Sequence, residues 1–400
     1  MKQLAIFCIE LILIFALPKI TFASNLVITD KIGVFGLPDD AEAQDLGVTW
    51  TRVAFPQWKQ YLSKPSSFNE RFAKLQKTNV IATIRSVNNK DYVVCGQDPD
   101  TLLSEANATD KVPAGKSIYD LISCMPKDLV STEKGSYRDF ITQAITSGKG
   151  KVDAWQIENE VYSTITRFWL GDARGEFDNF IKLFSLTSQM IRTIDPNTPI
   201  LAPGITFGHI DYDTIGNPKP TTNAQKESIE IIDKTVRRLF TDACSDFDVI
   251  DIHLYYTVES IPGRVAWVQK IMNETGCVKP IWSTEISGPD PFGKQTLSDK
   301  EFVQQQADEL QPRLQTALDA GLEKIIYFVY QQNSTSLDQG VVKLGLIDDN
   351  GKPKPAYAQM QMFTKVSKKS LPLRKIALYG GIGAGTIIFI GAIMLFSRKK

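Results

Sequence analysis

Two glutamate residues stand where apolar segments of this sequence end, and residues in such places can do chemistry. Glu160 closes the segment Trp155-Gln-Ile-Glu-Asn-Glu160, and Glu285 closes the segment Ile281-Trp-Ser-Thr-Glu285. A carboxylate that follows directly on a buried segment loses hydration unless it is paired, hydrogen-bonded or protonated, so folding alone does not favour it there. The two acids are therefore our first candidates for functional groups.

A pair of carboxyl groups that face each other across a cavity can cleave a glycosidic bond. One group must be neutral to protonate the leaving oxygen, and the other must be ionised to attack the anomeric carbon. When two such groups lie about 5 Å apart, ionisation of one raises the pKa of the other. Arg52, in Thr49-Trp-Thr-Arg52, can supply a cation beside the nucleophile, and the hydroxyl of Tyr255, in His253-Leu-Tyr255, can donate a hydrogen bond to the same carboxylate.

Short apolar, β-branched segments alternate with amphipathic segments and must position these side chains. The predicted strands are 32–35, 48–53, 80–84, 152–157, 199–202, 247–252, 280–284 and 324–329, and the predicted helices are 69–76, 137–146, 179–194, 226–243, 261–273 and 300–320. Apolar strands that alternate with helices indicate a parallel sheet covered on both faces. Repeated strand–helix units in one undivided chain predict the α/β class and a closed (β/α)8 TIM barrel, with an open doubly wound sheet as the alternative. The site of such a barrel lies at the carboxyl ends of its strands, where both acids stand.

The barrel is expected to span residues 26–363 without an internal linker. Residues 88–137 are long for a connection between a strand and a helix, so we expect an insertion over the mouth of the barrel. Residues 364–375, rich in Lys and Ser, are predicted to form a linker.

Apolar segments at both ends of the chain predict export and membrane anchoring. Residues 1–23 begin with Met-Lys, continue into an apolar run and end on small residues, as a cleaved signal peptide does; an uncleaved anchor is the alternative. Residues 376–396 are uncharged and, as a helix rising about 1.5 Å per residue, match the roughly 30 Å of hydrocarbon in a bilayer. With the basic tail 397–400 inside, we expect a single-pass protein of the cell membrane whose barrel is extracellular.

The same C-terminal segment has two further features. Gly381 and Gly385 form a G-x-x-x-G motif that can pack helices in lipid, but a span rich in Gly and Ala also produces this spacing by chance, so no oligomeric state follows. The segment also resembles a bacterial cell-surface sorting tail, although Leu371-Pro-Leu-Arg-Lys375 departs from the L-P-x-T-G pattern. Attachment to the cell surface by that route is therefore only an alternative.

Cysteines of the exported part predict disulfide bonds. Cys95, Cys124, Cys244 and Cys277 remain after the signal peptide is removed, and four cysteines allow three pairings. Because a short loop costs the least entropy to close, we expect Cys95–Cys124 and Cys244–Cys277.

The residues at the strand ends resemble those of the clan of retaining glycoside hydrolases with (β/α)8 barrels, which includes many cellulases, mannanases, β-galactosidases and β-xylosidases. The likeness rests on three motifs that end the fourth, sixth and seventh predicted strands, in this order: Asn159-Glu160, His253-x-Tyr255 and Thr284-Glu285. It implies that Glu160 is the acid/base and that Glu285 is the nucleophile. It also implies that Asn159 contacts the sugar 2-hydroxyl, and that the reaction is supported by three further residues, Arg52, His253 and Tyr255.

Two positions depart from the pattern of that clan. Val161 follows the acid/base where many members have Pro, and the eighth strand ends in Tyr327-Phe-Val-Tyr330 where several members have a Trp beneath the sugar. Both departures concern the substrate rather than proton transfer. Trp58 is the aromatic residue that we expect to stack on a sugar ring, because aromatic walls suit the apolar C–H surface of pyranoses.

The assigned residues have structural alternatives. Glu158 shares a face with Glu160 if the strand continues, since side chains alternate along a strand. Alternatively, Glu285 is a buried acid paired with an arginine, Arg52 forms an ordinary salt bridge, and His253 is a hydrogen-bonded core histidine.

Composition narrows the function further. Lys+Arg and Asp+Glu number 45 each, so the chain has no net charge to attract nucleic acid. The presence of two histidines, without H-E-x-x-H, C-x-x-C or G-x-S-x-G motifs, predicts neither a metal nor an organic cofactor. We therefore expect a membrane-anchored extracellular retaining β-glycosidase that hydrolyses poly- or oligosaccharides. The alternative is a catalytically silent, carbohydrate-binding surface barrel.

Overall fold

Parallel strands form a nearly closed barrel at the centre of the molecule. The computed structural model describes residues 28–54, 58–86, 93–94, 125–126, 128–162, 177–207, 210–290, 297–332 and 343–366. The barrel strands are β1 (Ile32–Phe35), β2 (Trp50–Ala54), β3 (Asn79–Ile84), β6 (Ala154–Ile157), β7 (Ile200–Leu201), β10 (Ile250–Leu254), β11 (Ile281–Ile286) and β12 (Lys324–Tyr327). These eight strands form one sheet in the order β10-β11-β12-β1-β2-β3-β6-β7.

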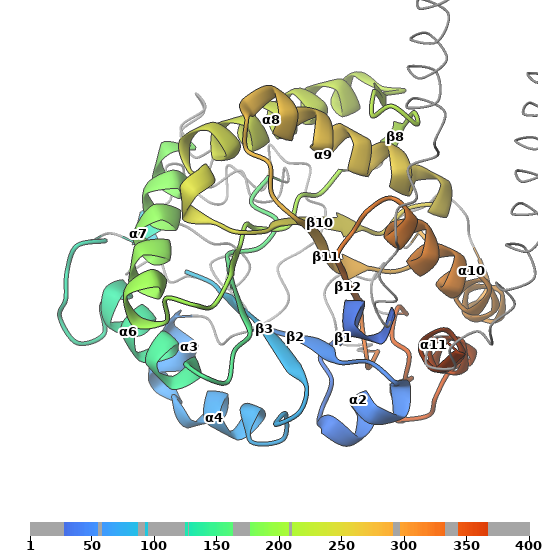
Figure 1. Ribbon diagram of the computed structural model, residues 1–400, viewed down its shortest axis with the longest axis horizontal. Coiled ribbons are helices and arrows are strands. Elements are labelled where there is room, and N and C mark those ends of the chain that lie inside the picture. Colours follow the sequence, from blue (N-terminus) through green and yellow to red (C-terminus); the bar gives the residue numbers. More distant parts are fainter. Residues whose placement is uncertain are drawn as a thin grey trace, which may run out of the picture.

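The sheet curves round on itself because its two outer strands meet. Parallel bridges from Leu201 to Val249 and from Ile205 to Ile252 connect the segment around β7 with β10. Helices surround the strands in Figure 1, as they do in a (β/α)8 barrel. The predicted barrel is therefore confirmed, and the chain does not form the open doubly wound sheet.

Some of the helices around the barrel begin or end at capping residues that the sequence carries. They are α2 (Asp40–Leu46), α3 (Trp58–Ser63), α4 (Ser66–Phe72), α6 (Tyr137–Gly148), α7 (Asp178–Ile194), α8 (Asn223–Asp242), α9 (Ile261–Thr275), α10 (Asp299–Asp319) and α11 (Pro355–Val366). Ser298 and Glu301 form a capping box at the start of α10, where each side chain bonds the backbone of the other. Gly276 ends α9 in the left-handed conformation, with φ of 75°.

Alternate residues of the strands fill the interior of the barrel in layers. The lowest layer is an apolar cluster made of Trp50, Ile81, Ala154, Leu201, Val249, Trp282 and Ile326. Two residues further along four of these segments, the same face carries polar side chains: Arg52, Thr83, Gln156 and Asp251. A polar layer therefore lies directly on an apolar floor, because side chains of a strand repeat on one face every second residue.

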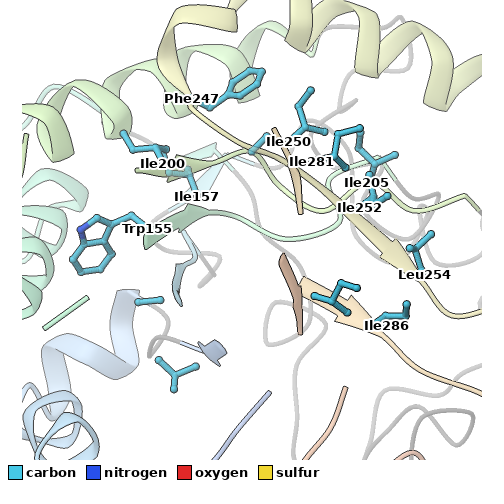
Figure 2. Close-up of a cluster of buried hydrophobic side chains, with 14 of the residues drawn as sticks. Trp155, Ile157, Ile200, Ile205, Phe247, Ile250, Ile252, Leu254, Ile281 and Ile286 are labelled. Atoms are coloured by element: carbon cyan, nitrogen blue, oxygen red, sulfur yellow. The ribbon is translucent and has the colours of Figure 1, made fainter. Parts of the chain in front are cut away.

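The opposite face of the strands packs against the helices. Trp155, Ile200 and Phe247 belong to the large core cluster that joins the sheet to these helices, and Figure 2 shows part of it. Two short antiparallel pairs lie outside the barrel: β4 (Val93–Val94) with β5 (Met125–Pro126), and β8 (Asp211–Tyr212) with β9 (Pro218–Lys219).

Three helices, α2, α3 and α11, were not expected from the apolar periodicity. One of them corrects the predicted boundary at residue 363, because α11 continues through Val366 and includes the first residues of the predicted linker. Thr364 is fully buried there, and its hydroxyl donates to the carbonyl of Leu46 at 2.6 Å. The composition of residues 364–366 suggested a tether, but α11 continues through them, and Thr364 packs against the end of α2.

Several predicted features lie outside the described residues. These are the signal peptide (1–23), the remainder of the linker (367–375), the membrane span (376–396), the tail (397–400) and the cysteines Cys95 and Cys124. Among the helices that the structure does describe, none combines the length and hydrophobicity of a membrane span.

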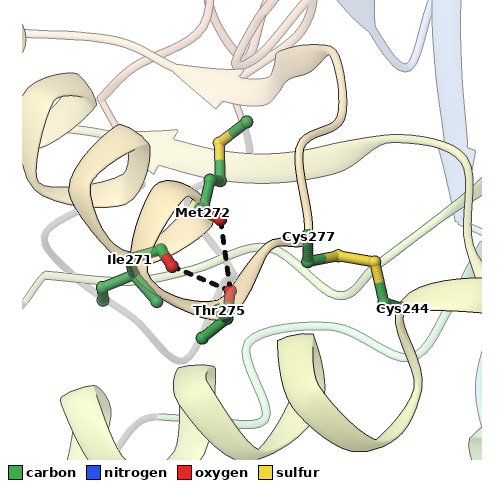
Figure 3. Close-up of a disulfide and its surroundings, with 5 residues drawn as sticks. All are labelled: Cys244, Ile271, Met272, Thr275 and Cys277. Atoms are coloured by element: carbon green, nitrogen blue, oxygen red, sulfur yellow. Dashed lines mark hydrogen bonds between the residues drawn. A yellow bond between two sulfur atoms is a disulfide. The ribbon is translucent and has the colours of Figure 1, made fainter.

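The predicted Cys244–Cys277 disulfide is present in the structure, and Figure 3 shows it beside the end of α9. It joins the segment after α8 to the segment that leads from α9 into β11, across a sequence separation of 33 residues. Cys277 itself is buried, with 1% of its surface exposed. The disulfide therefore links the segment that leads into β10 with the segment that leads into β11.

We predict that the double variant Cys244→Ala/Cys277→Ala unfolds more easily than the native protein. A cross-link over 33 residues restricts the unfolded chain by roughly 3 to 4 kcal/mol. Urea denaturation of the full chain should show a loss of this size, and non-reducing peptide mapping should recover the Cys244–Cys277 peptide. A Cys95–Cys277 peptide, or a variant as stable as the native protein, would contradict the prediction.

Candidate active site

The structure brings the two predicted acids together at the carboxyl ends of their strands. Glu285 lies in β11, and Glu160 follows β6. One oxygen of Glu160, one oxygen of Glu285 and a ring nitrogen of His253 all lie within 4.8 Å of one another. Glu285 is buried, while the side chain of Glu160 is 31% exposed. The two carboxyl groups therefore share one small region, of which Glu160 forms the more open side.

Glu285 is an ionised carboxylate held by donors on both of its oxygens. Arg52 of β2 donates from Nη1 to Oε1, and the hydroxyl of Tyr255 donates to Oε2. Burial by itself raises the pKa of Glu285, but the charges of His253 and Arg52, together with these hydrogen bonds, outweigh it and hold the pKa below its ordinary value. Burial and the nearby carboxylates raise the pKa of Tyr255 well above its ordinary value, so its hydroxyl remains a donor.

An irregularity in β11 lets Glu285 point into the barrel. The pairing with β10 runs from Asp251 opposite Trp282 to His253 opposite Glu285, which adds one residue to β11. In a regular strand, Thr284 and Glu285 would point to opposite faces, but here the hydroxyl of Thr284 reaches Asp251 while the carboxylate of Glu285 reaches Arg52. An extra residue of this kind re-aims a side chain, and such irregularities are frequent beside active sites.

Glu160 is placed by a backbone that has left the strand. β6 ends at Ile157, and both Glu158 and Glu160 have positive φ, at 63° and 48°. Residues with a Cβ adopt this region rarely, because it is sterically unfavourable. From this turn Glu160 Oε1 lies 2.5 Å from Nδ1 of His253.

The same turn separates Glu158 from Glu160. The alternation of side chains along a strand places both acids on one face, so the sequence pattern alone does not show which of them lies in the site. Glu158 is fully buried and accepts a hydrogen bond from the backbone N–H of Ser86 at 2.5 Å, with Arg85 at 3.9 Å. Glu160 instead faces His253 and is partly exposed. The alternation that would place both acids on one face ends with the strand, so the two side chains have different partners.

His253 lies between the acids and is almost completely buried. Burial lowers the pKa of its imidazole, but the negative charges of Glu285 and Asp251 and the hydrogen bonds to Asp251 and Glu160 raise it to about 10. At neutral pH the ring therefore carries a positive charge. Its nitrogen Nδ1 is also 3.5 Å from Oε2 of Glu285, so one cation serves both carboxylates.

Asn159 joins the cluster, whereas Trp58 does not. The side-chain oxygen of Asn159 accepts a hydrogen bond from Nη2 of Arg52 at 2.7 Å. Trp58 is 5% exposed, packs edge-on against Tyr137 and donates from its indole to the carbonyl of Gly135. The expectation that Trp58 stacks on a sugar is therefore wrong, since its large apolar surface is used in the core.

Several polar residues beneath the site were not singled out from the sequence. Asp251, Gln156, Thr83 and Thr284 are buried and hydrogen-bonded to one another or to Arg52. Asp251 had a visible signal, because it is a charged residue within the apolar segment 247–252. A buried charge must be paired or hydrogen-bonded, so such a residue indicates a buried network.

The cluster of Glu160, His253 and Glu285 also has the composition of a metal site. Both oxygens of Glu285, however, already accept bonds from Arg52 and Tyr255, and Nδ1 of His253 faces Glu160. A metal ion would have to displace these bonds and lie next to the guanidinium of Arg52. The residues therefore fit a hydrogen-bonded site better than a metal centre.

Fold and site together define a (β/α)8 barrel with paired carboxyl groups at its mouth. Residues 213–359 match the family described as Glycosyl hydrolase catalytic core. This part includes His253, Tyr255 and Glu285, whereas Arg52 and Glu160 precede it. No curated protein matches the sequence.

Solved structures of glycoside hydrolases share the fold at low sequence identity. A family 39 glycoside hydrolase from Bacteroides cellulosilyticus WH2 aligns with a TM-score of 0.53 and 14% identity, covering 85% of this chain and 64% of that one. A beta-galactosidase from Marinomonas ef1 aligns with a TM-score of 0.50 and 14% identity, covering 84% of this chain and 59% of that one. A glucosidase from Croceicoccus marinus aligns with a TM-score of 0.50 and 14% identity, covering 85% of this chain and 68% of that one. The chain thus spans less than two thirds of the first two proteins. The predicted resemblance to (β/α)8-barrel glycoside hydrolases is confirmed in the fold, and residues 213–359 carry the match to the glycosyl hydrolase core.

We predict that replacing Arg52 alone lowers the free energy of unfolding more than replacing both Arg52 and its partner Glu285 does. The variant Arg52→Met leaves Glu285 buried without its guanidinium, at a cost of about 3 to 5 kcal/mol. Adding Glu285→Gln removes the uncompensated charge, so the double variant should recover part of this loss. Urea denaturation of the four proteins in the cycle measures the coupling.

A matched control is the partly exposed pair of Arg192 and Asp248, whose side chains are 34% and 38% exposed. Arg192→Met should cost only about 0 to 1 kcal/mol. Equal losses at Arg52 and Arg192, or a double variant no more stable than Arg52→Met, would show that Glu285 does not depend on Arg52.

Proposed function

We propose that the protein is a retaining β-glycosidase in which Glu285 is the nucleophile and Glu160 is the acid/base. The observation that carries the proposal is the approach of the two carboxyl groups to within 4.8 Å at their nearest oxygens. In retaining enzymes the carboxyl groups are about 5 to 5.5 Å apart, whereas inverting enzymes leave about 6.5 to 9.5 Å for a water molecule. A gap of this size suits direct attack by one carboxylate on the sugar.

The environment of Glu285 supports the role of nucleophile. The carboxylate is ionised, and Arg52 and Tyr255 hold it in one orientation. In the first step an oxygen of Glu285 bonds the anomeric carbon as the bond to the leaving oxygen breaks. The hydrogen bonds that orient the carboxylate before the reaction reduce the reorganisation needed to reach the transition state.

The environment of Glu160 supports the role of acid/base. In the first step its proton passes to the leaving oxygen, which departs as a hydroxyl group. In the second step the Glu160 carboxylate takes a proton from water, whose oxygen attacks the anomeric carbon and releases Glu285. Its partial exposure gives the leaving group and then water access to the same oxygen, while Nδ1 of His253 is in place to stabilise the carboxylate.

The proposed substrates are poly- or oligosaccharides outside the cell. The similar structures include a beta-galactosidase and a glucosidase, which suggests β-galactosides and glucosides as the first compounds to test. We also propose that residues 1–23 direct export and that residues 376–396 anchor the protein in the cell membrane. This part of the proposal rests on the hydrophobicity and length of these two segments.

We predict that the full chain hydrolyses a β-glycoside with retention. A panel of glycans followed by NMR of the released sugar before mutarotation should show the β-anomer first. Glu160→Gln should lower kcat/KM by about 10² to 10⁴, because general acid catalysis contributes about that much. Glu285→Gln should abolish turnover, and Glu285→Ala with azide should give the α-glycosyl azide.

Glu158→Gln is the control for the assignment of Glu160. The amide oxygen can still accept from Ser86, so this variant should keep most of the native activity. An initial α-anomer would overturn the retaining mechanism. A loss in Glu158→Gln without one in Glu160→Gln would reverse the assignment, and binding of a glycan without turnover by the native protein would favour the silent barrel.

We also predict that truncation after Val366 releases the protein from the membrane. The full chain should sediment with membranes and resist extraction by salt or alkali, since about 20 apolar residues span a bilayer. Residues 1–366, which retain all of α11, should appear in the medium. Full-length protein in the soluble fraction would contradict anchoring, and truncated protein that stays in the cytoplasm would contradict export.

A further inference from the structure

Asp251 is a carboxylate that lies beneath the site and that the mechanism above does not use. It is fully buried in β10, two residues before His253. Oδ2 accepts from the amide of Gln156 at 2.6 Å and from the hydroxyl of Thr284 at 2.6 Å, and Oδ1 accepts from the backbone N–H of Thr284 at 2.7 Å. Nε2 of His253 lies 3.3 Å from Oδ2.

The direction of each hydrogen bond in this layer follows from Arg52. A guanidinium can only donate, so the oxygen of Thr83 accepts from Nε of Arg52 at 2.9 Å and its proton goes to Oε1 of Gln156 at 2.8 Å. The amide NH₂ of Gln156 must then face Asp251. Asp251 is thus an acceptor in every one of these contacts, as an ionised carboxylate is.

The same logic fixes the proton on Nε2 of His253. Near this nitrogen lie Oδ2 of Asp251 and Oγ1 of Thr284, each at 3.3 Å. The proton of Thr284 is already donated to Asp251, so both oxygens are available only as acceptors. Nε2 therefore carries a hydrogen, and Nδ1 is the nitrogen left to face Glu160.

We propose that Asp251 is a positioning residue: it keeps His253 as an imidazolium whose Nδ1–H is donated to Glu160 throughout the reaction. This inference rests on the proposed role of Glu160 as acid/base. The imidazolium stabilises the carboxylate that Glu160 becomes after it has protonated the leaving group. It also holds Oε1 of Glu160 in place while the proton is transferred.

The charges around the imidazole agree with this role. Among the residues that the structure describes, the titratable and charged groups that face it are Glu160 after β6, Asp251 in β10, Tyr255 after β10, and Glu285 in β11. Arg52 contacts Oε1 of Glu285, whereas His253 lies near Oε2; burial, and after it the charge of Asp251, raises the pKa of Tyr162. Against the desolvation cost of burial, Glu285 and Asp251 together raise the pKa of His253 to about 10.

Packing allows the ring a single position. Gly204 lies against the imidazole so closely that a Cβ there would be 2.0 Å from Nε2. The ring is held between this glycine and the carboxylates, so its orientation is not free to change as the proton of Glu160 moves. A side chain at position 204 would have to displace the ring from Asp251.

The test compares the native full chain with Asp251→Asn by NMR and by the pH dependence of kcat/KM. The chain has two histidines, so ¹⁵N labelling of histidine rings and the variant His209→Gln assign the signal of His253. We expect His253 to be an imidazolium at pH 8 in the native protein and neutral at pH 8 in Asp251→Asn. The loss of this cation beside Glu160 should move the alkaline limb of kcat/KM upward by about one pH unit or more.

Asp251→Ser provides a second variant if the asparagine variant does not fold, and Asp248→Asn is the matched control. Asp248 is bonded to Arg192 and to the backbone of Ile200, so its replacement should change neither the His253 signal nor the pH profile. A neutral His253 at pH 8 in the native protein, or an imidazolium that persists in the Asp251 variants, would overturn the proposal.

The two readouts separate this proposal from the proposed function. The NMR measurement does not require turnover, so it tests Asp251 and His253 even if no glycoside is cleaved. If His253 loses its proton in Asp251→Asn while the alkaline limb stays in place, Asp251 does not act on catalysis through Glu160, and the inference fails although the glycosidase activity stands. A uniform loss of activity at all pH values would likewise indicate only a structural role.

Discussion

The site depends on one interaction, the burial of an ionised Glu285 against Arg52. A carboxylate that is 7% exposed is unfavourable without compensation, and removal of one partner from such a pair leaves an uncompensated charge. Arg52 is itself almost completely buried, on the polar layer above the apolar floor of the barrel. The pair forms because β2 and β11, which are separated in the sheet by β12 and β1, both direct these side chains into the interior of the barrel. The bonds from Arg52 and Tyr255 fix the direction of the carboxylate, and, although burial raises its pKa, the charges of His253 and Arg52 hold that pKa below its ordinary value.

Arg52 also fixes the protons of the layer around it. It donates to Glu285, Asn159 and Thr83, and it cannot accept from any of them. Each following bond, from Thr83 to Gln156 and from Gln156 to Asp251, has its direction determined by the one before. The network therefore ends on a carboxylate beneath His253. A residue on one side of the barrel thus influences the protonation of the imidazole on the other, through contacts that need no movement.

The barrel and much of the site could be predicted from the sequence, because strands buried on both faces produce apolar runs and each run ends where the site must be. The boundaries of β1 agree with the prediction, and Arg52, Glu160 and Glu285 meet as the motifs implied. Trp58 was misplaced because an aromatic ring has the same sequence signal in a core as beside a ligand. The start of the linker was misplaced because Thr364 is polar, and its burial depends on its contact with Leu46 of α2, more than 300 residues earlier. Asp251 was overlooked because its partners lie on other strands.

The irregular parts of the strands carry the functional groups, and a period-two pattern cannot predict them. Regular alternation would turn Glu285 away from Thr284, and would place Glu158 beside Glu160. The extra residue in β11 turns Glu285 into the barrel beside Thr284. The left-handed residues after β6 separate Glu158 from Glu160. A non-glycine residue in the left-handed region costs of order 1 to 3 kcal/mol, and it persists only where surrounding contacts hold it. Here those contacts are the bond from Ser86 to Glu158 and the contact between His253 and Glu160, so the stability of the surrounding barrel offsets the strain that positions the acid.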